Sequence, residues 1–249
     1  MLNSYSIFMV DLTGRQIQIL RAIVERYIQT AEPVGSETID KQFNFGVSPA
    51  TIRNEMVYLA RNGYLRKVHT SSGRIPTSLA IKFYVRELMR ERDLSVADEV
   101  SVKERIWSNR DQLNDLLWES ARVMAERSRC IGLVMEEDGQ RVFHSGYAHL
   151  LNFPEFSNID VTRTVLTLLE EVRALKEIVD FGRSEEPVQL VLGEDLGNEY
   201  LAPVSFVFTE VTAGGDRLTM GVIGPSRLDY PYVIPMIKYF RSLIYELMG

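Results

Sequence analysis

Helix start and stop signals in the first 63 residues leave room for three short helices. Thr13 and Gln16 make a reciprocal capping pattern, in which each side chain accepts a hydrogen bond from the other residue's backbone amide. Pro33 ends the helix that follows, and Ser36 can cap a short second helix. The chain is therefore predicted to open with a compact group of short helices.

The third helix is predicted to start with Ser48 as its cap and Pro49 in its first turn, and to end at Gly63. Spacings of three and four residues place three apolar side chains on its buried face: Ile52, Met56 and Leu59. The other face carries arginine and asparagine, which can pair with guanine and adenine through two hydrogen bonds each. Two helices joined by a tight turn can present such a face to the major groove of DNA.

A basic β-hairpin is predicted directly after these helices, over residues 64–77. Its tip reads Thr70-Ser71-Ser72-Gly73, and its arms carry cations that can approach the phosphodiester chain or the minor groove. Three helices followed by a hairpin make a winged helix, so residues 1–91 are expected to bind DNA. The residues expected to read bases or hold phosphates are Ser48, Thr51, Arg53, Asn54, Tyr58, Arg61, Arg66, Lys67, His69 and Arg74.

Charge is divided unevenly along the chain, whose formal net charge is -6. Residues 1–90 hold 12 Lys and Arg against 7 Asp and Glu, whereas the other 159 residues hold 16 against 27. Attraction to a polyanion depends on the local face rather than on the sum. The basic first third is thus suited to nucleic acid, and the acidic remainder to another role.

After residue 91 the pattern predicts a linking helix and then a mixed domain. An apolar stripe predicts one helix from Val96 to Arg127, able to pack on its own domain or on a second copy: Ile106, Leu113, Leu117, Ala121 and Met124. Five strands follow, with helices at Asp160 to Phe181 and at Tyr232 to Met248. The predicted fold class is α+β, with a winged helix over 1–91, a helical linker over 92–128 and a mixed domain over 129–249.

Few side chains are placed to support catalysis or metal binding. Cys130 is the single cysteine, so no internal disulfide can form and a reducing cytoplasm is the expected compartment. His144 and His149 lack a third ligand in the sequence pattern, and neither a nucleophile elbow nor a phosphate-binding glycine motif occurs. We expect no enzyme activity, no metal, no cofactor, no export signal and no membrane span.

Five motifs stand out: AEPVGSETI from Ala31, VSPATIRNEM from Val47, HTSSGRIPT from His69, LLNFPEF from Leu150 and GVIGPSRLDYPYVIP from Gly221. Together and in this order they resemble the heat-inducible transcription repressors of the HrcA type. The resemblance implies an amino-terminal winged helix, a carboxy-terminal GAF-like domain and a dimer. It also implies binding to an inverted-repeat operator upstream of chaperone operons, and dependence on the GroE chaperonin.

The sequence departs from that family pattern at several places. Leu133–Met135 is followed closely by Val142–His144, which leaves no room for the dimerising domain that family members carry as an insertion there. Ala80 and Lys82 stand where the family has glycine and arginine, and Ser72 replaces a small apolar residue at the hairpin tip.

The first functional hypothesis is a homodimeric repressor of chaperone genes that reads both halves of a palindrome, because two-fold symmetry in a protein is matched in its operator. A second is a ligand-sensing regulator whose acidic domain binds a metabolite. Its candidate pocket is a strand-end loop: Gly221, Gly224, Pro225, Ser226, Arg227 and Asp229. A third is an interaction protein that uses the stripe between Val96 and Arg127.

Overall fold

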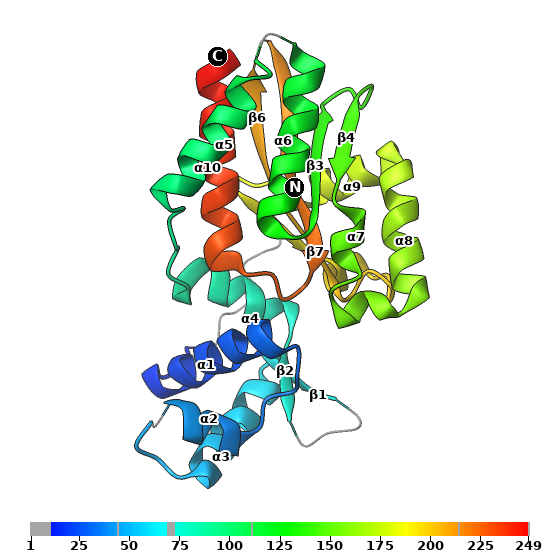
Figure 1. Cartoon of the computed structure of the whole chain (residues 1–249). Coiled ribbons are helices and arrows are strands. Elements are labelled where there is room, and N and C mark those ends of the chain that lie inside the picture. Colours follow the sequence, from blue (N-terminus) through cyan, green and yellow to red (C-terminus); the bar gives the residue numbers. More distant parts are fainter. Residues whose placement is uncertain (1–10, 44, 69–72, 111, 214, 249) are drawn as a thin grey trace. The chain divides into compact units, whose positions relative to one another are not determined.

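The computed structural model describes residues 11–43, 45–68, 73–110, 112–213 and 215–248, and it divides into two compact units (Figure 1). Unit 1 is Met1–Met89 and unit 2 is Arg90–Gly249. Both helices and strands occur in each unit, so the α+β fold class is confirmed. None of the described helices is long and apolar enough to cross a membrane.

Unit 1 contains the three predicted helices, a pair of short strands and a final helical segment. Its elements are α1 (Gly14–Thr30), α2 (Ser36–Phe43), α3 (Pro49–Arg61), β1 (Leu65–Lys67), β2 (Arg74–Pro76), α4 (Ser78–Phe83) and the π-helix η1 (Tyr84–Leu88). The Thr13 and Gln16 capping pattern is present at the start of α1. Gly63 has a φ of 79°, the left-handed conformation that the sequence predicts after α3. The core of unit 1 is closed by side chains without solvent exposure, among them Ile19, Leu20, Ile23, Ile39 and Leu59.

Unit 2 is built on a five-stranded antiparallel sheet with the strand order β4-β3-β7-β6-β5. The strands are β3 (Ile131–Glu136), β4 (Val142–Ser145), β5 (Gln189–Leu192), β6 (Val204–Ala213) and β7 (Asp216–Pro225). The register places Leu133 of β3 opposite His144 of β4 on one side and Gly221 of β7 on the other. All five predicted strands are therefore present.

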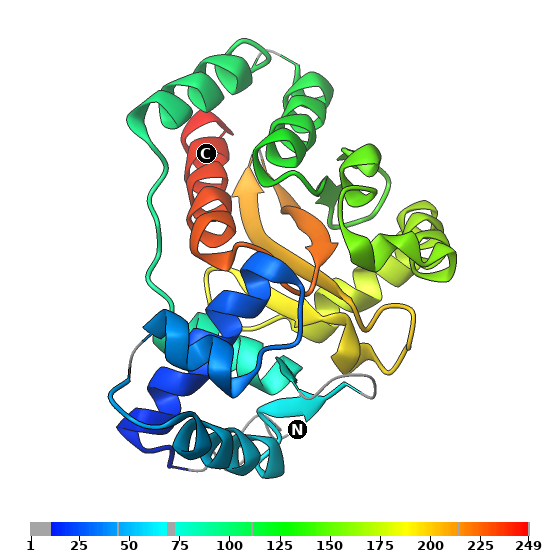
Figure 2. The same cartoon turned by 60° about the horizontal axis from the view of Figure 1, so that its bottom comes forward.

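Helices cover both faces of this sheet (Figures 1 and 2). One face packs against α6 (Leu113–Ser128) and α10 (Tyr230–Met248), with α5 (Val96–Trp107) outside them. The other face is covered by α7 (Tyr147–Leu150), the 3-10 segment η2 (Pro154–Ser157), α8 (Ile159–Glu170) and α9 (Val172–Gly182). A further 3-10 segment, η3 (Gly193–Leu196), precedes β6 in the chain. As predicted, Val204, Phe206 and Phe208 point to the same side of β6, into the core under α8 and α9.

The prediction of a single helix from Val96 to Arg127 is wrong, because α5 and α6 are separate. The hydroxyl of Ser108 and the amide of Asn109 donate to the carbonyl oxygens of Glu104 and Arg105, so polar side chains close the end of α5. Both helices belong to unit 2. The stripe packs on its own unit, because Ile106, Leu117, Ala121 and Met124 are fully buried.

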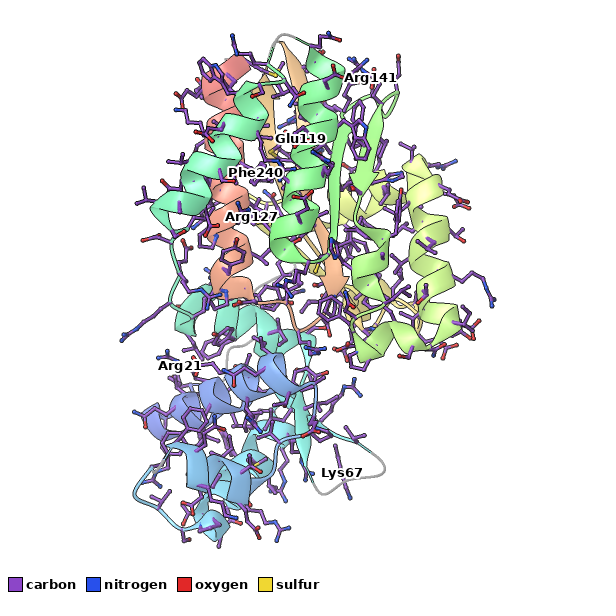
Figure 3. All side chains as sticks on the ribbon, in the orientation of Figure 1. Arg21, Lys67, Glu119, Arg127, Arg141 and Phe240 are labelled. Atoms are coloured by element: carbon purple, nitrogen blue, oxygen red, sulfur yellow. The ribbon has the colours of Figure 1, made fainter. Side chains whose placement is uncertain are left out.

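An ion-pair cluster joins α5 to α6. Arg105 donates from Nε to Glu119 at 2.8 Å and from Nη1 to Glu126 at 2.5 Å, and Arg127 contacts both Asp98 and Ser101 (Figure 3). The two tryptophans of the chain lie on the same helix pair, Trp107 at the end of α5 and Trp118 on α6. Both are nearly half exposed.

The predicted helix from Asp160 to Phe181 is also two helices, α8 and α9, which meet at Glu171. The backbone of Glu171 leaves the helical region, with φ of -105° and ψ of 83°. This turn lets both helices bury apolar residues against the same sheet face.

Candidate nucleic-acid interface

The amino end of α3 is fixed by its own cap. Ser48 Oγ accepts the backbone amide of Thr51 at 3.2 Å, and the two hydroxyls lie 3.1 Å apart. Both predicted phosphate-holding hydroxyls therefore already take part in the helix cap. Ser48 is exposed, and Thr51 is partly exposed.

The buried side of α3 holds the helix against α1. Ile52 and Leu59 have no solvent exposure, and Met56 is 5% exposed. Glu55 adds a polar link, since its carboxylate accepts from Gln16 Nε2 at 2.9 Å and lies 3.7 Å from the guanidinium of Arg15. The rotation of α3 is thus set by both apolar and polar contacts.

That rotation turns the predicted reading residues outward: Arg53, Asn54, Tyr58 and Arg61 are all exposed. Neither Arg53 nor Arg61 forms an ion pair with a carboxylate in the described part of the chain. Exposed cations and an exposed amide on one helix face are the chemistry that base edges and phosphates require.

The strand pair adds a second basic element. Lys67 of β1 and Arg74 of β2 are opposite each other in the antiparallel register, so their side chains leave the same face of the ribbon. The backbone of Arg74 also exchanges two hydrogen bonds with Val34, of 2.8 and 2.9 Å. This bridge brings the segment before α2 alongside β2.

An open groove of about 540 Å³ lies between these elements of unit 1. Its walls come from the start of α2, from α3 and from the strand pair. Three predicted residues, Arg53, Lys67 and Arg74, meet in it, and Lys67 projects from its strand in Figure 3. Glu37 is the acidic residue of the lining, so cations outnumber carboxylates there three to one.

The other predicted residues are placed differently. Arg66 precedes Lys67 on β1 and does not line the groove, because neighbouring side chains of a strand point to opposite faces. Asn54, Tyr58 and Arg61 lie on the outward turns of α3 rather than in the groove. His69 and Ser72 lie outside the described residues.

Sequence reasoning missed the contribution of α2. Ser36, Glu37 and Thr38, its first residues, line the groove. The first amides of a helix have no partner inside the helix and attract anions. Ser36 predicts where this helix begins, but the position of the helix beside β2 depends on the bridge between Val34 and Arg74, and that contact leaves no local sequence signal.

The candidate ligand loop of unit 2 is occupied by internal contacts. Gly221, Gly224 and Pro225 are buried at the end of β7. Arg227 forms an ion pair with Glu155, with both side chains nearly buried, and Asp229 pairs with Arg92. The motifs LLNFPEF and GVIGPSRLDYPYVIP thus meet through Glu155 and Arg227. An apolar cavity beside β7, lined by Leu133 and Gly221, measures about 20 Å³ and has room for little more than one water.

Similarity to known proteins extends over most of the chain. Residues 78–234 match the family described as HrcA protein C terminal domain. A protein of Symbiobacterium thermophilum named heat-inducible transcription repressor HrcA is 28% identical, with 96% of this chain and 99% of that protein covered. A protein of the same name from Desulforamulus reducens is 27% identical, with coverage of 92% and 94%.

The first of these relatives is also longer than this chain. The alignment to it has 340 positions, and the chain has 249 residues, so at least 91 positions (340 less 249) hold no residue of this chain.

A crystal structure described as that of a hypothetical protein at 2.2 Å resolution has a similar fold. Its TM-score is 0.72 at 16% identity, and the match covers 95% of this chain and 97% of the other.

Proposed function

The chain belongs to the HrcA family of heat-inducible transcription repressors, and on that premise we propose that its unit 1 is a winged helix that binds operator DNA. The observation that carries the proposal is the groove in which Arg53, Lys67 and Arg74 meet beside the exposed face of α3. The operator proposed is an inverted repeat upstream of chaperone operons.

In this proposal α3 enters the major groove. Arg53 and Asn54 face the base edges, where arginine pairs with guanine and asparagine with adenine. Tyr58 and Arg61 lie further along the same exposed side and contact the backbone or position the helix. The hairpin of β1 and β2 is proposed to be the wing that approaches the neighbouring minor groove or phosphates, and His69 is among the residues proposed to contact the DNA.

The groove between α3 and the strand pair then holds one strand of the phosphodiester backbone. Lys67 and Arg74 supply charge from one side, and the amino end of α2 supplies unpaired amides from the other. Arg53 stands at the border between the phosphate groove and the base-reading face. Each cation that neutralises a phosphate releases counterions, so binding weakens as salt rises.

Unit 2 is proposed to be the GAF-like part that joins two copies, because an inverted repeat is read by two subunits related by a two-fold axis. The GroE chaperonin is proposed to act on the folded state of this repressor in the cytoplasm. No metabolite is needed in this scheme, and the cavity of about 20 Å³ gives no support to a ligand-sensing alternative.

The proposal is tested by comparing the affinity of the full chain for the inverted repeat with its affinity for a scrambled duplex of equal length. At about 150 mM salt, the specific duplex should bind at least about 1000-fold more tightly. Equal affinities for the two duplexes would exclude sequence-specific repression by this protein.

Two variants distinguish base recognition from electrostatic contact with the phosphates. Arg53→Ala should lose about 1 to 3 kcal/mol on the inverted repeat and much less on the scrambled duplex. Lys67→Ala should weaken both duplexes alike and lower the slope of log K against log salt by about 0.9. Arg173→Ala, at a fully solvated position of α9, is the matched control and should change neither affinity.

A further inference from the structure

Helix α8 carries a stripe of side chains on the side that faces away from the sheet. Val161, Val165 and Leu168 are buried under the helix. Ile159 is 65% exposed and Leu166 is 37% exposed, although both are large and apolar. Figures 1 and 2 both show α8 on the outer side of unit 2.

The stripe has a regular order of apolar and charged residues. Ile159, Arg163, Leu166 and Glu170 follow one another at steps of four, three and four, so they share one face of the helix. Arg163 and Glu170 are both exposed, and Leu166 lies between them. The positive charge therefore precedes Leu166, and the negative charge follows it.

Aromatic side chains widen the stripe at both ends. Tyr147 of α7 is 42% exposed; burial raises the pKa of its phenol, and the charge of Glu170 adds to the rise. Tyr200 is 38% exposed, and the charges of Glu199 and then Asp160 raise the pKa of its phenol. We call these six residues the α8 face: Tyr147, Ile159, Arg163, Leu166, Glu170 and Tyr200.

The order of charges on the α8 face is complementary to that of a second copy whose α8 runs in the opposite direction. If a second α8 runs antiparallel, Arg163 of each copy lies beside Glu170 of the other, and the two Leu166 side chains meet near the two-fold axis. Two ion pairs and an apolar centre result from one helix face. A parallel copy would place both charges beside like charges, and a uniformly charged partner would place one of the two beside a like charge.

The charged residues are available for this exchange. Arg163 pairs within its own helix with Asp160 at 3.1 Å, and the two side chains are 67% and 44% exposed, so that pair is weak and is replaced at little cost. Glu170 forms no ion pair with a cation in the part of the chain that the structure describes.

We propose that the α8 face is the surface through which two copies of this chain associate, antiparallel along α8, with Arg163 of each copy paired with Glu170 of the other. The choice of a second copy rests on the proposed function, because an inverted repeat requires two subunits. The surface belongs to unit 2, so its test needs no DNA. One helix face is a modest interface, and we expect association at about micromolar concentration.

The test is the mass of the full chain in solution, by light scattering without DNA, from about 1 to 100 μM. The wild type should approach the mass of two chains at the upper end. Arg163→Glu and Glu170→Arg each place like charges opposite one another, and each should weaken association at least about tenfold. Arg173→Glu, on α9 and equally solvated, should leave the mass of the wild type.

Charge reversal supplies a gain of association that a damaged fold cannot produce. An equal mixture of the Arg163→Glu and Glu170→Arg proteins should form mixed dimers, because opposite charges then meet at both positions. The double variant carrying both changes should regain the wild-type mass. Leu166→Lys is a further variant at a half-solvated position and should also give single chains.

The proposal is overturned if the wild type has the mass of one chain throughout, or if Arg163→Glu leaves the dimer intact. It is equally overturned if the mixture of the two single variants stays monomeric while both have the wild-type circular dichroism. A half-site duplex keeps the two proposals apart. If the half-site is bound but dimers fail to form through α8, only this surface is wrong, whereas loss of all specific DNA binding contradicts the proposed function.

Discussion

At the scale of single residues, the contact between α6 and the sheet depends on the missing side chain of Gly132. A Cβ at this position would lie 2.0 Å from the carbonyl oxygen of Ala121 and 2.8 Å from the backbone nitrogen of Ala125. Backbone atoms of a packed helix cannot move aside without displacing α6. Gly132→Ala should therefore lower the free energy of unfolding by about 3 kcal/mol, measured by urea denaturation.

Gly14→Ala is the matched control for that substitution. A Cβ at Gly14 would have no atom within 4 Å, and the position lies at the start of α1. Alanine favours helix more than glycine does, so this variant should be as stable as the wild type or slightly more stable. Equal effects of the two substitutions would contradict the close approach at Gly132.

Cys130 provides a prediction about reactivity. Burial raises the pKa of its thiol to about 12, from an ordinary value of 9.0. Because the thiolate is the reactive form, a disulfide reagent at pH 8 should not label the native protein but should label it fully in urea. Rapid labelling of the native protein would show that the thiol is accessible.

The same pKa shift gives the sign of a pH effect. Below pH 9 the thiol is protonated in both the folded and the unfolded chain, so the free energy of unfolding keeps the full contribution of the buried thiol. As the pH rises from 9 towards 12, the unfolded chain loses the proton first, and the free energy of unfolding should fall. Cys130→Ala should remove this part of the alkaline loss.

At the scale of elements, α5 is held to its unit by ion pairs as well as by apolar burial. Val102 and Ile106 are its buried residues, while Arg105 holds both Glu119 and Glu126 across to α6. Arg105→Ala should cost about 1 kcal/mol of unfolding free energy at low salt and less at high salt, because exposed pairs are screened. Arg173→Ala, whose pair with Glu177 is fully solvated, should cost nothing measurable.

Acid should act on the same cluster. Burial alone would raise the pKa of Glu119, but hydrogen bonds from Arg122 and Arg105 outweigh it and lower that pKa. The hydrogen bond from Arg105 likewise lowers the pKa of Glu126. This contribution is present above pH 4.5 and is lost as the pH falls below that value, so hydrogen exchange in α5 should accelerate there first. A uniform acceleration over unit 2 would contradict it.

Local signals predicted the elements of unit 1 because its helices start and stop at capping residues, such as Thr13, Ser48 and Gly63, that act over a few positions. The break between α5 and α6 leaves no such signal in the apolar stripe. Ile106 and Leu113 are seven residues apart, and a continuous helix would place them on the same face, so the pattern continues unchanged across a turn. The exposed face of α3 was predictable for the same local reason, whereas the groove required the contact of Val34 with Arg74, forty positions apart.

At the scale of the whole molecule, the two units differ: unit 1 carries the basic groove, and unit 2 carries the buried five-stranded sheet. We expect operator DNA to slow hydrogen exchange in α2, α3, β1 and β2, where three cations and the amino end of α2 line the groove. The central strands of unit 2, β3, β6 and β7, should exchange at the same rate with and without DNA, as measured by mass spectrometry. Protection of those strands together with an unprotected α3 would contradict the proposal that unit 1 binds the DNA.

The intrinsic fluorescence of Trp107 and Trp118 reports on the state of α5 and α6. Unit 1 has no tryptophan, so tryptophan emission arises wholly from α5 and α6 of unit 2, whereas the basic groove belongs to unit 1. Arg110 lies 4.8 Å from the Trp107 ring, which makes the emission sensitive to the end of α5. A spectral change on titration with duplex would therefore be a direct optical record of communication from one domain to the other, with no label attached.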